Sequence, residues 1–140
     1  MTPERMAEIH KAAFAPHRGW TDNEFRSLCA SEPVECFATG DGFALVRTLA
    51  NEAELLTLAV HPQGQRSGQA DSIMQTWMTS TQADTAFLEV AADNHAALAL
   101  YVKHGFVPFG RRKGYYSRTD GPPVDAVLMR VALTPRQSGK

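Results

Sequence analysis

The feature that most constrains the fold is a strand-like run that ends near a proline and leads, through a loop of small residues, into a helical pattern. Residues 54–60 form the run, Pro62 follows, and the loop at residues 65–70 reads Gln-Arg-Ser-Gly-Gln-Ala. The first N–H groups of a helix lack internal partners and lie at the positive end of its dipole. Because Gly68 and Ala70 carry little or no side chain, a diphosphate can approach these amides closely. The pattern predicts an anion site at the start of a helix.

The length and charge of the chain exclude several classes of protein. Its 140 residues suffice for one domain with a substantial core, which we expect over residues 1–133, with a polar C-terminal tail at residues 134–140. A formal net charge of −1 gives no electrostatic reason to expect nucleic acid or a membrane surface as a partner. No apolar run reaches the roughly 20 residues of a membrane span, and no signal peptide is visible. We therefore expect a cytoplasmic protein, with Cys29 and Cys36 as buried, reduced thiols.

Four helices are predicted, and the second has the clearest start. Thr21 is an N-cap residue, Glu24 completes a capping box, and Trp20 can pack onto Phe25. Helical spacing of apolar residues predicts the buried face of each of the others. The first helix is capped by Thr2 and buries Met6, Ile9 and Ala13. The helix after the anion loop buries Ala70, Ile73, Met74, Trp77, Met78 and Thr81. The last helix is capped by Asp93 or Asn94, ends at Gly105 and has Leu98, Tyr101 and Val102 on one face.

The sequence also predicts six strands. Gly40-Asp41-Gly42 marks the turn after the first strand, and Asn51-Glu52 lies near the next turn. The short apolar run at residues 86–90 is typical of a buried central strand. The order of elements is two helices, a three-strand meander, a helix, a strand, a helix and two strands, which fits an α/β (α+β) domain. The expected strands are residues 34–39, 43–49, 54–60, 86–90, 106–109 and 124–133.

Two residues in apolar surroundings are candidates for proton transfer. Glu89 lies within Phe87-Leu88-Glu89-Val90, where burial would raise its pKa into the range of a general base. The alternative is that strand alternation directs Glu89 to solvent or to a salt bridge. Tyr101 lies in an apolar helix and is either a core aromatic residue with its hydroxyl at the rim or a proton donor to a sulfur leaving group.

The remaining polar residues give weaker signals. Arg111-Arg112-Lys113 is followed by Gly114-Tyr115-Tyr116, which forms either a solvated hairpin or one wall of a peptide-binding groove. The histidines show no metal-ligand spacing and no clear serine or cysteine partner, so none is assigned a catalytic role. They are His10, His17, His61, His95 and His104.

The loop at residues 65–70 resembles motif A of the GNAT acyltransferases, Arg/Gln-x-x-Gly-x-Gly/Ala. Together with the segments that follow, it looks like the RimI branch of that superfamily, with similar spacing over roughly residues 54–133. Ser67 stands where a basic residue is usual and Asp71 adds a carboxylate, which would reduce affinity for phosphates. The segments that carry the resemblance are Leu88-Glu89-Val90, Asn94, Ala99-Leu100-Tyr101, Gly105-Phe106, Arg111-Arg112, Tyr115-Tyr116 and Asp125-Ala126-Val127-Leu128-Met129.

The resemblance implies a GNAT fold, in which a mixed, mostly antiparallel sheet is splayed around acetyl-CoA between its fourth and fifth strands. It also implies about four helices. The family's first strand is not visible ahead of the first helix here, and it is either absent, encoded upstream or supplied by a partner. Carried over by position, the resemblance makes Glu89 the general base and Tyr101 the general acid, places Asn94 near the thioester, and puts Tyr115 and Tyr116 against the substrate. The residues expected around acetyl-CoA are Leu58, Ala59 and Val60 along the pantetheine arm and Gln65, Arg66, Ser67, Gly68, Gln69, Ala70 and Asp71 around the pyrophosphate.

The activity that the resemblance implies is acetyl-CoA-dependent acetylation of a protein N-terminus, without a metal. RimI-branch enzymes acetylate the N-terminal alanine of a small-subunit ribosomal protein. An α-amino group, with a pKa of about 7.7–8.0, is easier to deprotonate than lysine, with a pKa of about 10.4. The backbone N–H of Val60 would stabilise the oxyanion. Ala91 replaces an arginine that is usual in the branch, so the acceptor could instead be a small amine or a lysine. If the protein is not an enzyme, the alternative is a non-catalytic sensor that binds CoA.

Overall fold

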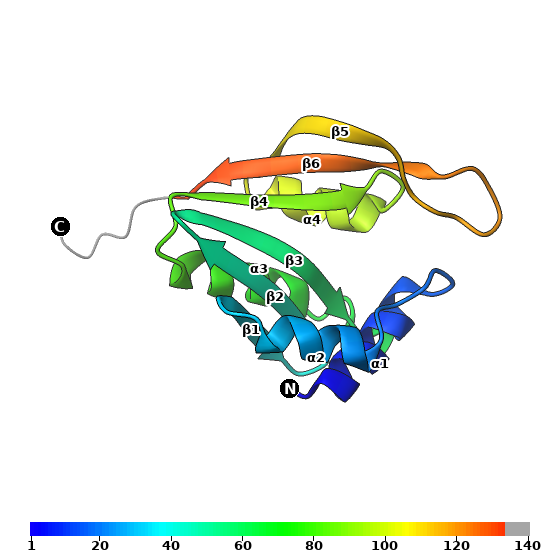
Figure 1. Cartoon of the computed structure of the whole chain (residues 1–140), viewed down its shortest axis with the longest axis horizontal. Helices are drawn as coiled ribbons and strands as arrows, with labels where there is room; N and C mark the ends of the chain where they lie inside the picture. The colour runs from blue at the N-terminus through cyan, green and yellow to red at the C-terminus, as the bar shows by residue number, and fades with distance from the viewer. Residues whose placement is uncertain (134–140) are drawn as a thin grey trace.

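A six-stranded mixed sheet with strand order β1-β2-β3-β4-β6-β5 organises the chain in a computed structural model that describes residues 1–133 (Figure 1). The tail predicted at residues 134–140 lies outside the described residues. β3 and β4 are parallel, whereas all other neighbouring strands are antiparallel. The elements are α1 (Pro3–Phe14), α2 (Asp22–Ala30), β1 (Val34–Thr39), β2 (Gly42–Leu49), β3 (Glu52–Val60), η1 (Pro62–Gly64), α3 (Gln69–Ser80), β4 (Thr85–Ala91), α4 (His95–Lys103), β5 (Val107–Tyr116) and β6 (Val124–Ala132).

All six predicted strands are present, and the fifth is much longer than predicted. β5 runs to Tyr116, so the basic and aromatic residues that could have formed a hairpin turn lie in a strand. Its pairing with β6 is irregular between Pro108 and Gly110 and again after Arg112. Such irregularities interrupt the alternation by which a strand is recognised in a sequence. The turn before β3 includes Ala50 in addition to the predicted Asn51, and both residues have positive φ.

The predicted helix starts are confirmed, and those of α1, α2 and α4 carry a side-chain cap, whereas α3 begins after Gly68 without one. Thr21 and Glu24 form the reciprocal capping box ahead of α2, and the rings of Trp20 and Phe25 lie 5.5 Å apart between centroids. Of the two candidate caps for α4, Asn94 is the one observed. Local hydrogen bonds of this kind are legible in sequence because both partners lie within one helical turn.

The expected burial of Val102 and of the two cysteines is wrong. The Val102 side chain is exposed on α4, although its neighbour Tyr101 is buried, because successive helical residues point about 100° apart. The free thiol of Cys29 is exposed for the same reason, beside Leu28 on the inner side of α2, and Cys36 is only partly buried on the edge strand β1. Within residues 1–133, no helix combines the length and the apolarity that a bilayer crossing needs.

A bulge in β3 marks the point where the sheet divides. Leu56 is an extra residue opposite the step from Leu45 to Val46 in β2. Parallel pairing of β3 with β4 ends one residue earlier, at Leu55 and Leu88. Beyond this point the two strands diverge (Figure 1). The predicted splay is confirmed, and it falls between the third and fourth strands because no strand precedes α1 among the described residues.

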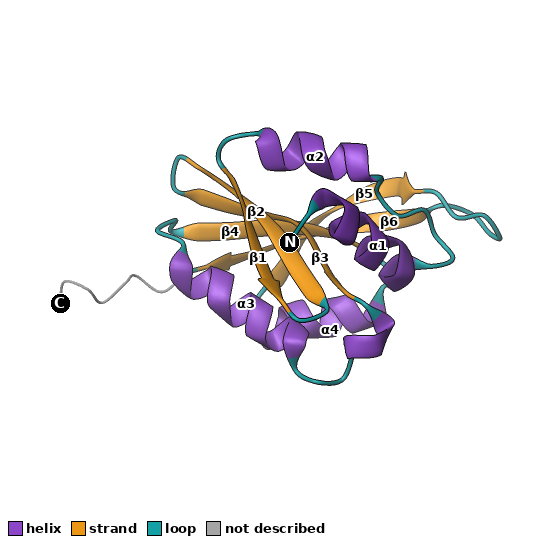
Figure 2. Ribbon diagram, turned by 90° about the horizontal axis from the view of Figure 1, so that it is seen from below, coloured by secondary structure: helices purple, strands orange, loops and turns teal. Residues whose placement is uncertain are grey.

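The helices cover the sheet unequally. α1 and α2 lie on one side of the sheet and α3 and α4 on the other (Figure 2). The core beneath α1 and α2 is small and contains Phe25, Phe43 and Leu45, whereas the larger core on the opposite side contains Trp77 and Phe106. The face of β4, β6 and β5 opposite α4 has no helix over it (Figure 1).

Candidate active site

The gap between β3 and β4 exposes one edge of the β3 backbone. The His61 amide donates to the Asp41 carbonyl oxygen at 2.8 Å, on the β2 side. Because backbone groups alternate along a strand, the N–H and C=O groups of Leu58 and Val60 point away from β2, while those of Ala59 point toward it. β4 has already diverged at this height. Among the described strands, the N–H groups of Leu58 and Val60 and the carbonyl of Leu58 therefore have no partner in the sheet. The Val60 carbonyl accepts from the Gln65 side chain, and the backbone of Ala59 belongs to the sheet.

The loop before α3 has the geometry of an anion site. Gly68 is the N-cap residue with φ of 82°, and no side chain caps the helix. A Cβ atom added to Gly68 would meet no other atom within 4 Å, so the space in front of the helix is open. Arg66 also has a positive φ of 66°, which is uncommon for a residue with a side chain. The first amides of α3, including that of Ala70, lack partners within the helix and face this opening.

Three side chains of the loop brace it from within. The Gln65 amide donates to the Val60 carbonyl oxygen at 2.9 Å, and the Ser67 hydroxyl donates to the carbonyl oxygen of Gly64. The Gln69 side chain accepts a hydrogen bond of 2.8 Å from the backbone of the β1–β2 turn. These predicted cofactor residues therefore hold the loop in place, and the backbone amides are the groups presented to an anion.

The Asp71 carboxylate turns toward α4. It accepts hydrogen bonds from Lys103 Nζ at 3.0 Å and from His104 Nε2 at 2.9 Å. These bonds hold the pKa of Asp71 below its usual range. The Lys103 charge offsets the negative charge by which Asp71 was expected to weaken phosphate binding.

Glu89 lies on β4, one residue past the last pair with β3, and its carboxylate forms an ion pair. The side chain is 26% exposed, and Oε2 lies 2.9 Å from Nε of Arg112. The expected burial is therefore wrong, because strand alternation directs Leu88 and Val90 into the core and Glu89 to the opposite face. The salt-bridge alternative describes the observed contact. Partial exposure leaves the carboxylate within reach of a ligand.

The Tyr101 hydroxyl is available although its ring is buried. The ring packs edge-on against Phe106, 6.1 Å between centroids, and the residue is only 7% exposed. No residue of the described chain forms a hydrogen bond with this hydroxyl. Every fully buried side-chain oxygen or nitrogen in that part of the chain does have a hydrogen-bond partner, so the hydroxyl oxygen is not fully buried and reaches accessible space. Burial and, to a smaller extent, Tyr116 raise its pKa, so Tyr101 is protonated and can donate.

Tyr116 connects the two candidate catalytic groups. Burial raises the pKa of its hydroxyl, and the negative charge of Glu89 raises it further, while Tyr116 in turn raises the pKa of Tyr101. The three side chains are therefore close enough to influence one another electrostatically. Tyr115 is exposed and lies edge-on to Tyr116 at 5.1 Å.

A second ion pair beside Tyr116 was not predicted. The Arg118 guanidinium donates to both carboxylate oxygens of Asp93, at 2.8 and 2.7 Å, and lies 5.8 Å from the Tyr116 ring centroid. The two partners are 25 residues apart, and no local signal in the sequence connects them. The adjacent Asn94 uses its side-chain oxygen to cap α4, accepting from Ala97 at 3.2 Å, which leaves only its NH₂ group for a ligand.

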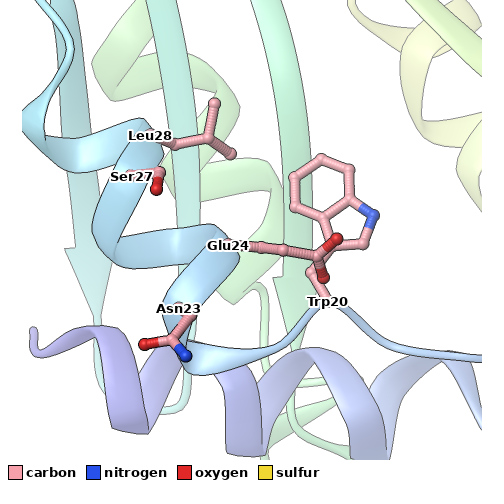
Figure 3. Close-up of a pocket in the computed structure, with 5 residues that line it drawn as sticks. All are labelled: Trp20, Asn23, Glu24, Ser27 and Leu28. Carbon is pink, nitrogen blue, oxygen red and sulfur yellow. The ribbon is translucent and has the colours of Figure 1, made fainter.

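The surface has a depression beside α2. It measures about 530 Å³ and is lined by Trp20, Asn23, Glu24, Ser27 and Leu28 (Figure 3). Its only carboxylate, Glu24, is already engaged by Thr21 and Arg18. None of the predicted site residues lies there. In residues 1–133 no cluster of side chains could hold a metal ion.

Comparison with known proteins agrees with this geometry. The profile of the Acetyltransferase (GNAT) family matches residues 4–106. The [ribosomal protein bS18]-alanine N-acetyltransferase of Escherichia coli K12 is 31% identical over 122 residues, covering 82% of each chain. The N-alpha-acetyltransferase RimI of Mycobacterium tuberculosis is 32% identical over 136 residues, covering 91% of this chain and 84% of the relative.

A solved structure extends the similarity to three dimensions. The crystal structure of the ribosomal-protein-S18-alanine N-acetyltransferase from Escherichia coli superposes with a TM-score of 0.84 at 28% sequence identity. The match covers 99% of this chain and 92% of that one. The splayed sheet, the family profile and the relatives together show that this chain belongs to the GNAT acetyltransferase family and is an N-acetyltransferase of the RimI type.

Proposed function

We propose that the protein transfers an acetyl group from acetyl-CoA to the α-amino group of a protein N-terminus. The observation that supports this proposal is the end of β3–β4 pairing at Leu55 and Leu88, which is followed along the chain by the uncapped start of α3 and by two groups suited to proton transfer. Glu89 lies on one wall of the gap and Tyr101 on the helix that follows it.

The residues around the gap fit acetyl-CoA chemically. The outward backbone groups of Leu58 and Val60 match the amides of a pantetheine arm, as an added strand would. The amides at the start of α3 and the side chain of Arg66 suit a diphosphate. Bound there, acetyl-CoA would supply the acetyl group as an activated thioester.

Each proton-transfer group then has one task. Glu89 accepts the proton that the substrate amine loses as it attacks, directly or through a water molecule. The backbone N–H of Val60 donates to the oxygen on which negative charge develops. Tyr101 gives its proton to the departing sulfur. Holding amine and thioester side by side supplies much of the remaining reduction in the barrier.

A ribosomal protein beginning with alanine is the proposed acceptor. The names of the relatives in Escherichia coli identify ribosomal protein bS18 as theirs. An α-amino group, with a pKa of about 7.7–8.0, is partly neutral at physiological pH and suits a carboxylate base better than lysine does. Such an acceptor places the enzyme in the cytoplasm.

The test is acetylation of defined acceptors by the purified protein. A peptide beginning Ala-Arg-Tyr-Phe, the start expected of the ribosomal target of the RimI branch, should gain one acetyl group by mass spectrometry, with release of one equivalent of free thiol from acetyl-CoA. The same peptide with a blocked N-terminus should give neither. Thiol release with free amines but not with the peptide would indicate a small-amine enzyme, and CoA binding without release would indicate a sensor.

A further inference from the structure

The cation on Glu89 comes from two strands away. Glu89 lies on β4 and Arg112 on β5, and β6 lies between them. The register pairs Arg112 with Ala126 and Glu89 with Leu128 on β6. The small Ala126 side chain leaves room for the guanidinium to cross above β6 and reach Oε2 of Glu89 at 2.9 Å. The contact is therefore made over the open face of the sheet.

The two ion pairs beside the site differ in how firmly they are held. The Arg118 side chain is 12% exposed and makes two hydrogen bonds to Asp93, so it is fixed. The Arg112 side chain is 56% exposed, and its other contact is with the exposed ring of Tyr115, 5.4 Å from Cζ to the centroid. Arg112 can therefore swing into solvent, whereas the largely covered Arg118 is held in place by its two hydrogen bonds.

We propose that Arg112 occupies, in the enzyme without acceptor, the place on Glu89 that the α-ammonium group of the acceptor takes on binding. This inference rests on the proposed function, because it requires an amine to approach Glu89. Both cations are attracted to the single negative charge of the Glu89 carboxylate, and an ammonium group bound beside Arg112 would be repelled by its like charge. Arg112 thus acts as an internal competitor that the correct ligand displaces.

The size of the competition follows from the exposure of the pair. Partly exposed ion pairs contribute little free energy, so removing Arg112 should increase the affinity for the acceptor only about two- to fivefold. The gain should depend on a free α-amino group. It should also depend on Glu89, because both cations compete for that carboxylate.

The experiment measures binding by titration calorimetry, without turnover, in the presence of saturating CoA. The ligand is the Ala-Arg-Tyr-Phe peptide, free or with an acetylated N-terminus. The control variant is Arg111→Gln, which removes the same charge one residue away but breaks a pair with Asp125 instead. Arg112→Gln should bind the free peptide about two- to fivefold more tightly than the wild type, while Arg111→Gln and the charge-preserving Arg112→Lys stay near the wild-type affinity.

Two further comparisons decide between the explanations. The acetylated peptide should bind all variants equally, and Arg112→Gln should give no gain when Glu89 is also Gln. An equal gain from Arg111→Gln would assign the effect to long-range charge and overturn the inference, as would an unchanged affinity or no binding of the free peptide. Failure of the proposed function would appear separately, as binding of the free peptide without any acetylation when acetyl-CoA replaces CoA.

Discussion

Leu55 and Leu88 are the last residues through which β3 and β4 pair, and the residues that follow them on the two strands belong to the proposed site. The bulge at Leu56 follows at once on β3, and Glu89 follows at once on β4. The end of pairing between β3 and β4 thus leaves the backbone of Leu58 and Val60 without a neighbouring strand on that side. The Glu89 carboxylate follows the same break on β4. The fold itself therefore creates the binding edge and positions the candidate base.

Replacing Gly68 by alanine should reduce CoA affinity by roughly tenfold, or about 1.4 kcal/mol. The added Cβ would project into the open space where the diphosphate is proposed to bind. The positive φ will also cost about 1–2 kcal/mol of stability, so Gly114→Ala, with φ of 59°, is the matched control. Calorimetry and thermal unfolding should show both variants destabilised but only Gly68→Ala weakened in CoA binding. Equal CoA affinity in the two variants would contradict the placement.

Replacing Glu89 by glutamine should lower kcat by about 10²-fold at neutral pH, the usual contribution of a general base. The loss should shrink as the pH rises past the pKa of the acceptor amine, because the amine then deprotonates without help. The measurement is a profile of kcat against pH for both proteins at saturating substrates. A loss that stays constant across the profile would remove Glu89 from the role of base.

Replacing Tyr101 by phenylalanine should lower kcat by about 10²-fold and leave acetyl-CoA affinity nearly unchanged, because the ring and its contact with Phe106 remain. Since the pKa of Tyr101 is raised above its ordinary value, the wild type should keep its acid form through about pH 10. Its rate should therefore show no decline from this group between pH 8 and about 10. Equal losses in turnover and in binding would mean that Tyr101 only packs.

The buried His10 should make stability depend on pH. Its ring nitrogens lie 3.2 Å from the Thr57 hydroxyl oxygen and 3.1 Å from the Trp20 amide nitrogen, and burial lowers its pKa to about 4. Between its ordinary pKa of about 6.5 and about 4, the unfolded chain binds a proton that the folded chain does not. The contribution of His10 to the free energy of unfolding is thus fully present above about pH 6.5. The free energy of unfolding should fall by about 3 kcal/mol as the pH drops toward 4.

Urea unfolding of the wild type and of His10→Phe at several pH values measures this effect. The variant should be less stable near neutral pH, because the Trp20 amide loses its acceptor, but its stability should change less between about pH 6.5 and 4. His95→Gln, at an exposed position on α4, is the control and should follow the wild type. Parallel curves for His10→Phe and the wild type would contradict the buried, neutral state.

The elements that the sequence predicts well are those specified by neighbours along the chain. The capping box of Thr21 and Glu24 and the cap of Asn94 were legible because each partner lies within a few residues. The start of α3 was marked by Gly68 and its loop. The bulge at Leu56, in contrast, depends on how β2 and β3 align, and a single residue out of register leaves no local trace in composition.

The site was less predictable than the fold, because its contacts join distant residues. The resemblance drew attention to Glu89 and Tyr101, but neither periodicity nor composition could pair Glu89 with Arg112 or Asp93 with Arg118 across separate elements. The wrong expectation of a buried Glu89 has the same origin. An apolar run shows that a strand is central, but only the arrangement of the covering helices decides which of its two faces is closed.

The most direct test of the central claim is a crystal structure of the protein with bound coenzyme A. The account predicts the diphosphate against the amides at the start of α3, the pantetheine arm along Leu58 and Val60, and the sulfur between Glu89 and the Tyr101 hydroxyl. A nucleotide bound outside the gap between β3 and β4, or Glu89 and Tyr101 side chains directed away from the sulfur, would contradict it.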